Sequence, residues 1–291
     1  MVVLFAVSVA AFGILFAASA GPAQAGVAAA VKGQVTALPE GAIEHPLKSG
    51  DKIFQGDTIK TGADGRLQVL LLDSTVFTLG PLSAVKMDEF VYDPATDDGK
   101  VKASMLKGIF RVVTGKVSHK KPENMEVALP SGTLGFRGTQ VAGIIDGQQT
   151  MVVLLGPVSA GRISVSNLVN GEVITIDVDE RGFGTIVGGP NMAPIPVFQV
   201  SEADLARIAN ALGQQLTGGA DMSSTGDGGV GGGSTSPSVN TEELLNILST
   251  IDDLGQQSQQ AAQDIATTKV KTDHKDSSNS DGQTGGFIAM E

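Results

Sequence analysis

The stretch with the strongest chemical signal is PSGTLGFRGTQ, residues 130–140, in which Gly132, Gly135 and Gly138 stand three positions apart. A glycine-rich turn binds phosphate when a helix follows it, because the helix N-terminus presents free N–H groups and a positive dipole end. No lysine stands at the position that a P-loop requires, and residues 140–147 have the pattern of another strand and turn. We therefore interpret the stretch as a loop that forms a structural corner, not as a phosphate site.

The side chains of this corner have different predicted roles. Leu134 and Phe136 are expected to enter a core, while the glycines and Thr139 belong to the corner itself. Arg137 has two interpretations. It is either half-buried against a carboxylate, which is the preferred interpretation, or it faces a ligand.

Four aspartates could form a calcium site or an acid–base pair, namely Asp51, Asp57, Asp64 and Asp73. Each of them neighbours a glycine or a serine, a pattern typical of turns in which the carboxylate accepts backbone N–H groups. We therefore predict turn roles for Gly50, Asp51, Gly56, Asp57, Asp73, Gly80 and Pro81.

The remaining reactive residues show no catalytic arrangement. The histidines His45, His119 and His274 have no metal-ligand spacing and no nucleophile beside them, and the chain has no cysteine. We predict no catalytic, cofactor-binding or metal-binding residue. The basic run at residues 116–121 is either a patch for an anionic glycan or lipid headgroup or a solvated loop, and the loop is preferred.

Composition narrows the class of protein. The chain has 291 residues and a formal charge of −11, which argues against nucleic-acid binding because that needs clustered lysine and arginine. Glycine is abundant, at 38 residues, and aromatic residues make up only 4%. These values favour short strands joined by tight turns.

The N-terminus indicates export. Residues 2–20 are apolar and uncharged, and Ala23 and Ala25 supply the small residues of a signal-peptide cleavage site. We predict a signal peptide over residues 1–25. An uncleaved membrane anchor is the alternative, and both interpretations place the rest of the chain in the periplasm or outside the cell.

The middle of the chain predicts an all-β domain over residues 26–200, built as a short-strand sandwich or a solenoid-like stack. Alternating or apolar runs bounded by turn residues occur at 67–72, 75–79, 108–113, 125–129, 150–155, 161–166 and 172–178. The sequence at 79–84 recurs in similar form at 155–160, so we interpret the two as one corner built twice.

The C-terminal third has a different composition. A capping pattern at Ser201 and an apolar face predict a helix over 201–217. Residues 218–240 are rich in glycine and serine and predict a disordered linker. An amphipathic helix is expected over 241–266, which docks on the β-domain, pairs with the first helix, or self-associates with another copy. Residues 267–291 are expected to be a disordered tail.

An ordered series of motifs resembles the FecR domain family. It comprises residues 47–62, 64–67, 72–74, 79–83, 107–112 and 114–115, and it ends on Leu129–Thr139. The resemblance covers roughly residues 30–160. It implies an extracytoplasmic, all-β, non-enzymatic domain.

We therefore expect a secreted or periplasmic protein with a binding or structural role at the cell envelope. Its partner would be an unknown envelope protein or glycan. The alternative is a membrane-anchored sensory protein of the iron-uptake signalling type, without a recognisable anti-sigma segment.

Overall fold

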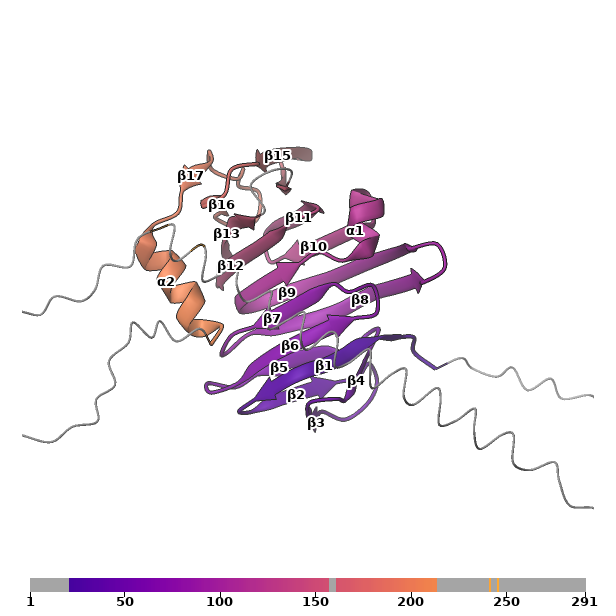
Figure 1. Cartoon of the computed structure of the whole chain (residues 1–291). Coiled ribbons are helices and arrows are strands. Elements are labelled where there is room, and N and C mark those ends of the chain that lie inside the picture. Colours follow the sequence, from indigo (N-terminus) through magenta and orange to yellow (C-terminus); the bar gives the residue numbers. More distant parts are fainter. Residues whose placement is uncertain (1–20, 157–160, 214–240, 242–244, 246–291) are drawn as a thin grey trace, which may run out of the picture.

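The computed structural model describes residues 21–156, 161–213, 241 and 245, which form two β-sheets packed face to face with one long strand common to both (Figure 1). The expected all-β class is confirmed. The chain passes back and forth between the two sheets as it progresses along the sandwich, from β1–β6 at one end to β14–β17 at the other. Successive strands therefore lie along the sandwich approximately in chain order.

Within the described residues, sheet A contains nine strands, and all their pairings are antiparallel. In spatial order they are β4 (Lys52–Phe54), β1 (Gln24–Lys32), β6 (Arg66–Leu71), β7 (Val76–Leu79), the second half of β9 (Asp98–Val113), β12 (Gln140–Asp146), β13 (Gln149–Gly156), β16 (Phe183–Val187) and β17 (Phe198–Gln199).

Sheet B contains the first half of β9, which pairs in parallel with β10; the other pairings are antiparallel. The order is β3 (His45–Pro46), β2 (Val35–Leu38), β5 (Thr58–Thr61), β8 (Ala84–Asp93), β9, β10 (Met125–Leu129), β11 (Gly132–Arg137), β14 (Arg162–Val169) and β15 (Glu172–Val178).

The inner faces of the two sheets form the main core. Phe77 and Phe110 of sheet A and Met105 and Leu134 of sheet B are among its fully buried side chains. Alternate residues of each strand contribute to it, as the period-two pattern of the sequence predicts. The core therefore holds the two sheets together along their length.

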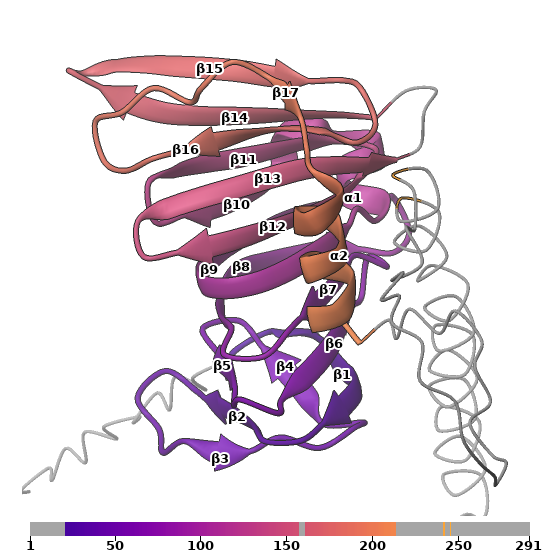
Figure 2. The same cartoon turned by 90° about the vertical axis from the view of Figure 1, so that its left-hand side faces the viewer.

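The outer face of sheet A is covered by α2 (Glu202–Ala211), which crosses its strands (Figure 2). Leu205 and Ile208 of the helix are buried against Ala142 and Leu155 of the sheet. The side chain of Ser201 caps the helix by accepting a hydrogen bond from the Asp204 N–H.

Only part of the predicted C-terminal region is described. Thr241 and Leu245 are helical, and Leu245 packs in the same cluster as α2. The predicted linker at 218–240, the rest of the predicted helix at 241–266 and the predicted tail at 267–291 lie outside the described residues.

The predicted signal-peptide boundary falls within a strand. Ala25 belongs to β1 and is fully buried, and its carbonyl accepts a hydrogen bond from Leu72 N–H at 3.0 Å. The Ala23 carbonyl accepts one from Gln55 N–H at 2.9 Å. A chain that begins at Gly26 lacks these contacts.

Strand β9 changes sheets at Gly108. Residues before it pair with β8, and residues after it pair with β7 and β12. Gly108 has φ +93°, and a Cβ there would lie 2.2 Å from Ser83 Oγ. The bend therefore needs glycine for two reasons, namely a left-handed backbone and a close approach.

The corner at residues 80–83 packs beside this bend. Gly80 N–H donates to the Ile109 carbonyl at 2.8 Å, and Ser83 Oγ accepts from Ile109 N–H at 2.9 Å. The corner leads from β7 in sheet A to β8 in sheet B. The related segment between β13 and β14 also leads from sheet A to sheet B, although its residues 157–160 are not among those described.

The four aspartates each accept a backbone N–H at a turn or loop. Asp51 Oδ2 accepts from Lys48, Asp57 Oδ2 from Phe54, and Asp64 Oδ1 from Gln34, at 2.7, 2.8 and 3.3 Å. Across the described residues, no three acidic or histidine side chains are grouped as a metal site requires. Three of the carboxylates thus bond the backbone of their own turn, whereas Asp64 joins its turn to Gln34, thirty residues earlier in the chain.

Asp73 is the most buried of these aspartates. It accepts hydrogen bonds from Thr75 N–H at 3.0 Å and from the Thr75 hydroxyl at 2.8 Å. The same hydroxyl accepts from Gly115 N–H at 3.0 Å, so the turn between β6 and β7 is tied to the segment after β9. Burial raises the pKa of the Asp73 carboxyl, and the hydrogen bonds from Thr75 oppose that rise.

Gly108→Ala is predicted to destabilise the domain more than Gly171→Ala. Gly171 has a similar φ of +87° but nothing within 4 Å of its Cβ position, so it isolates the backbone cost. That cost is about 1–2 kcal/mol, and the contact with Ser83 is expected to add about 1–3 kcal/mol. Urea unfolding measures both variants, and equal losses would show that the bend is not sterically constrained.

Asp73 is predicted to make stability depend on pH. Because its pKa is raised in the folded state, its contribution is fully present below its ordinary pKa of 3.8 and is lost as pH rises through the folded value. Asp73→Asn keeps an oxygen for Thr75 but carries no charge. The stability of the variant relative to the native chain should therefore increase as pH rises above 4.

Urea unfolding of both chains between pH 4 and pH 8 measures this difference. Asp51→Asn controls for the loss of a turn carboxylate. A difference between native chain and Asp73→Asn that stays constant over this range would contradict the assignment.

Candidate functional site

The stretch at 130–140 forms strand β11 and the turn that follows it. Leu134 and Phe136 point into the core, as expected, but the interpretation of the stretch as a loop is wrong. Thr133, Gly135 and Arg137 alternate with them and face outward. The glycine at 135 allows β14 to approach, since a Cβ there would lie 2.6 Å from Ser164 Oγ.

The end of the motif ties β11 to its neighbours. Gly138 has φ +56° and begins the turn. Thr139 N–H donates to Thr114 Oγ1 at 2.9 Å, and the Thr139 hydroxyl donates to the Gly156 carbonyl. At the other end of the strand, a Cβ on Gly132 would lie 2.5 Å from the Ser166 carbonyl oxygen. The motif residues therefore support backbone geometry.

A groove of about 350 Å³ lies on the outer face of sheet B above β11. Its floor is formed by Gly135 and Ser164. One side is formed by the 3-10 helix η1 (Pro122–Asn124) and β10, with Glu123 and Glu126, and the other by Asp177 of β15. The register places Glu126, Gly135, Ser164 and Asp177 in one row across four strands.

Two arginines lie at one end of this groove. Arg137 of β11 and Arg162 of β14 stand directly opposite each other in the antiparallel pair, and both are exposed. Like charges in this position repel. Arg162 forms an ion pair with Asp177 at 3.3 Å.

Arg137 is not half-buried against a carboxylate, contrary to the preferred interpretation. Within the described part of the chain it has neither a hydrogen bond nor an ion pair. Its guanidinium therefore lines the groove with its hydrogen-bonding capacity available to a ligand. The second interpretation, in which Arg137 faces a ligand, fits this position.

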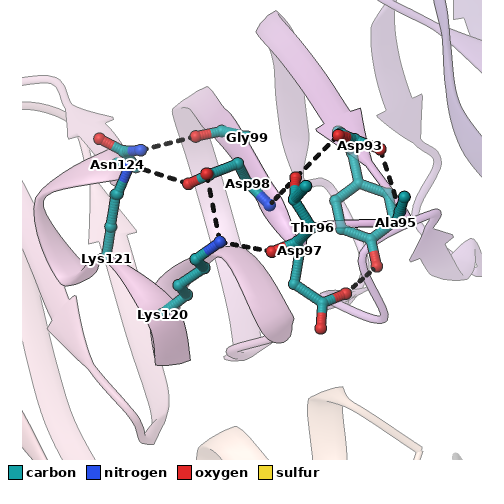
Figure 3. A network of polar contacts seen from close by, with 10 residues as sticks. Asp93, Ala95, Thr96, Asp97, Asp98, Gly99, Lys120, Lys121 and Asn124 are labelled. Atoms are coloured by element: carbon teal, nitrogen blue, oxygen red, sulfur yellow. Dashed lines mark hydrogen bonds and ion pairs between the residues drawn. The ribbon is translucent and has the colours of Figure 1, made fainter.

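The basic run at 116–121 is not a solvated loop. It forms α1 (Lys116–Lys120) and the residue after it, and it packs against the tip of the β8–β9 hairpin (Figure 3). Lys120 and Lys121 pair with Asp98 at 3.1 and 2.8 Å, and Lys116 pairs with Asp97 at 3.4 Å. The hydrogen bonds from Lys121 and Lys120 lower the pKa of Asp98.

These ion pairs occupy the lysines that an anionic glycan or lipid would need. Asn124 adds a hydrogen bond to the Gly99 carbonyl at 2.7 Å, so the hairpin also holds η1 at the edge of the groove. His119 lies beside Thr114, with 3.5 Å between its Nε2 and Oγ1. The run thus has a structural role.

Several groove residues were not found from the sequence, namely Glu126, Arg162, Ser164 and Asp177. They are outward-facing residues of three strands, far apart in the chain. Their only signal is the alternation in 125–129, 161–166 and 172–178, which identifies a face but not which strands are neighbours.

None of the helices in the described ranges has the length and apolarity needed to cross a membrane.

Comparison with known proteins shows similarity to a family model and to solved structures. The family model described as "FecR protein" matches residues 57–159. Two crystal structures, at 1.65 and 2.50 Å, of a candidate anti-sigma factor from Parabacteroides distasonis are 14% identical, with a TM-score of 0.38. The match covers 51% of this chain and 62% of that protein, so it spans less than two thirds of its length. No curated protein matches this chain.

The family match extends from the end of the β4–β5 turn to the segment after β13. It includes the shared strand β9, the corner at 80–83 and the whole 130–140 motif, which agrees with the resemblance seen in the sequence. The similarity to the FecR family therefore covers residues 57–159 of this chain.

Proposed function

We propose that this protein is a non-enzymatic, extracytoplasmic FecR-domain protein that binds a cell-envelope partner through the groove of sheet B. The observation that carries the proposal is Arg137, which is exposed at the end of a groove and directly opposite a second arginine. An anionic group of the partner would relieve the repulsion between them and accept hydrogen bonds from the guanidinium.

The rest of the groove supports recognition of a polar partner. Ser164 and Thr133 present hydroxyl groups, and Glu123 and Glu126 present carboxylates on the facing side. A partner with an acidic group near Arg137 and donor groups near the glutamates would match this arrangement. Since no aromatic ring faces outward among the residues lining the groove, recognition would rest on hydrogen bonds and charge.

A non-enzymatic role fits the same residues. A serine acts as a nucleophile when a base lies within hydrogen-bond reach. Neither described histidine lines the groove: His45 lies on β3 and His119 on α1. Asp177 stands next to Ser164 in the row, and Glu126 is one strand further away, beyond Gly135. Carboxylates and a hydroxyl on one face can bind a polar partner, so this row does not by itself indicate catalysis.

Sequence features of the N-terminus support the proposed location. The apolar run at residues 2–20 and the small residues Ala23 and Ala25 are the features on which it depends. Removal after Ala25 would release the protein into the periplasm or medium. The mass of the protein recovered from the envelope distinguishes the cleaved form from a form that keeps its N-terminal apolar run, because a chain that begins at Gly26 has no anchor.

The family match favours a second candidate, in which a retained anchor holds the same domain and the groove receives a regulatory signal. The binding surface is the same in both candidates. They differ in whether the N-terminal apolar run remains attached.

Arg137→Gln is predicted to weaken binding to the envelope partner about tenfold or more, because a charge-assisted hydrogen bond contributes roughly 1.5–3 kcal/mol. Native protein and variant are immobilised and exposed to solubilised envelope, and the bound molecules are quantified by mass spectrometry. Arg207→Gln is the matched control. Arg207 is an exposed arginine on α2, the helix that covers sheet A, so it lies away from the groove of sheet B.

If Arg137→Gln and the native protein recover equal amounts of the bound molecules, the groove is not the binding surface. Loss by both arginine variants would indicate that net charge, and not the groove, determines binding.

A further inference from the structure

The edge strand β15 differs from the other three edge strands that the described ranges contain. β3 is two residues long and includes Pro46, β17 is two residues long, and β4 is three residues long and begins with Lys52. β15 has seven residues, without proline or lysine, and its register with β14 is unbroken. Short length, proline, lysine and bulges are the common protections of a sheet edge. β15 therefore lacks the usual protection against pairing with another strand.

The backbone of β15 is paired on one side. The strand hydrogen-bonds to β14, and among the described segments it forms no backbone hydrogen bond with any other. Its outward side chains Val173, Thr175 and Asp177 are exposed, and the strand lies at the end of the sandwich (Figure 2). The free N–H and C=O groups of such an edge can pair with another extended chain.

The core is open beside this edge. Ile174 and Ile176 of β15 face inward but are only half-buried, whereas Val165 of β14, opposite Ile176, is fully buried. Ile195, in the segment between β16 and β17, is 43% exposed at the same end, where its N–H donates to the Ile186 carbonyl at 3.0 Å. A free backbone edge and uncovered apolar side chains thus lie together.

The sequence of β15 favours a second copy of this chain as the occupant. In an antiparallel pair of two β15 strands centred on Thr175, Ile174 of one copy faces Ile176 of the other. Glu172 and Asp177 each face a valine, so no like charges meet. Directly opposed residues point to the same face, so the inner faces of the two copies are continuous. A two-fold arrangement is also the commonest one for two identical chains.

We propose that β15 pairs in antiparallel fashion with β15 of a second copy, so that sheet B continues from one copy into the other. The isoleucines of the two strands then cover the open ends of both cores. The contact is made by the edge of sheet B and not by its outer face, so this inference is independent of the proposed binding function. It places the grooves of the two copies on the same face of the joined sheet.

A charge at the centre of β15 tests the proposal in the full-length chain. Thr175→Lys brings two like charges opposite each other across the dimer axis. Thr133→Lys is the matched control, because Thr133 lies in the same row of the same outer face, two strands from the edge. Sedimentation velocity at about 1–100 µM should show equal dimerisation of the native chain and Thr133→Lys, and a dissociation constant at least about tenfold higher for Thr175→Lys.

A native chain that stays monomeric over this range would overturn the proposal. Equal dimerisation of the two lysine variants would overturn it as well, because the copies would then meet through another surface.

A disulfide experiment locates the contact without relying on the strength of dimerisation. The chain has no cysteine, so Thr175→Cys gives each copy a single thiol. Directly opposed residues of an antiparallel pair have the Cα separation that a disulfide needs. Mild oxidation should therefore link copies of Thr175→Cys at least about tenfold faster than copies of Thr133→Cys. Equal rates would show that the thiols meet by random collision and would contradict the pairing of β15.

Discussion

The structure depends on a single constraint, namely that β9 belongs to both sheets. Its first half hydrogen-bonds to β8 and β10 in sheet B, and its second half hydrogen-bonds to β7 and β12 in sheet A. The bend between the halves is fixed by the contact of Gly108 with Ser83. Because one strand sets the register on both sides of the core, the sheets are expected to fold and unfold as one unit.

The candidate site follows from this arrangement. β10 pairs in parallel with the first half of β9, which places η1 beside the hairpin that β8 and β9 form. The lysines of the 116–121 run are then neutralised by Asp97 and Asp98. The positive charge that is left facing the groove is that of Arg137, with Arg162 already paired to Asp177. The fold thus uses the lysines of the 116–121 run for structure and leaves Arg137 available to a ligand.

Sequence reasoning identified the strands whose two faces differ in polarity, such as β6, β10 and β15. It missed β8 and the first half of β9, since lysines and acidic residues there cover the outward face and obscure the short inward pattern of Val101, Ala103 and Met105. It assigned β11 to a loop because glycines occupy outward positions. The groove could not be predicted from the sequence, because it depends on which strands are neighbours, and tertiary pairing decides that.

The central claim is that the outer face of sheet B contacts a partner in the envelope, and a photoreactive side chain placed at Thr133 tests it most directly. Thr133 lines the groove, while a photoreactive side chain at Arg207 of α2 reports on the opposite outer face. In living cells, irradiation should give a discrete adduct from position 133 and none from position 207. Identical adducts from the two positions, or none from position 133, would contradict the account.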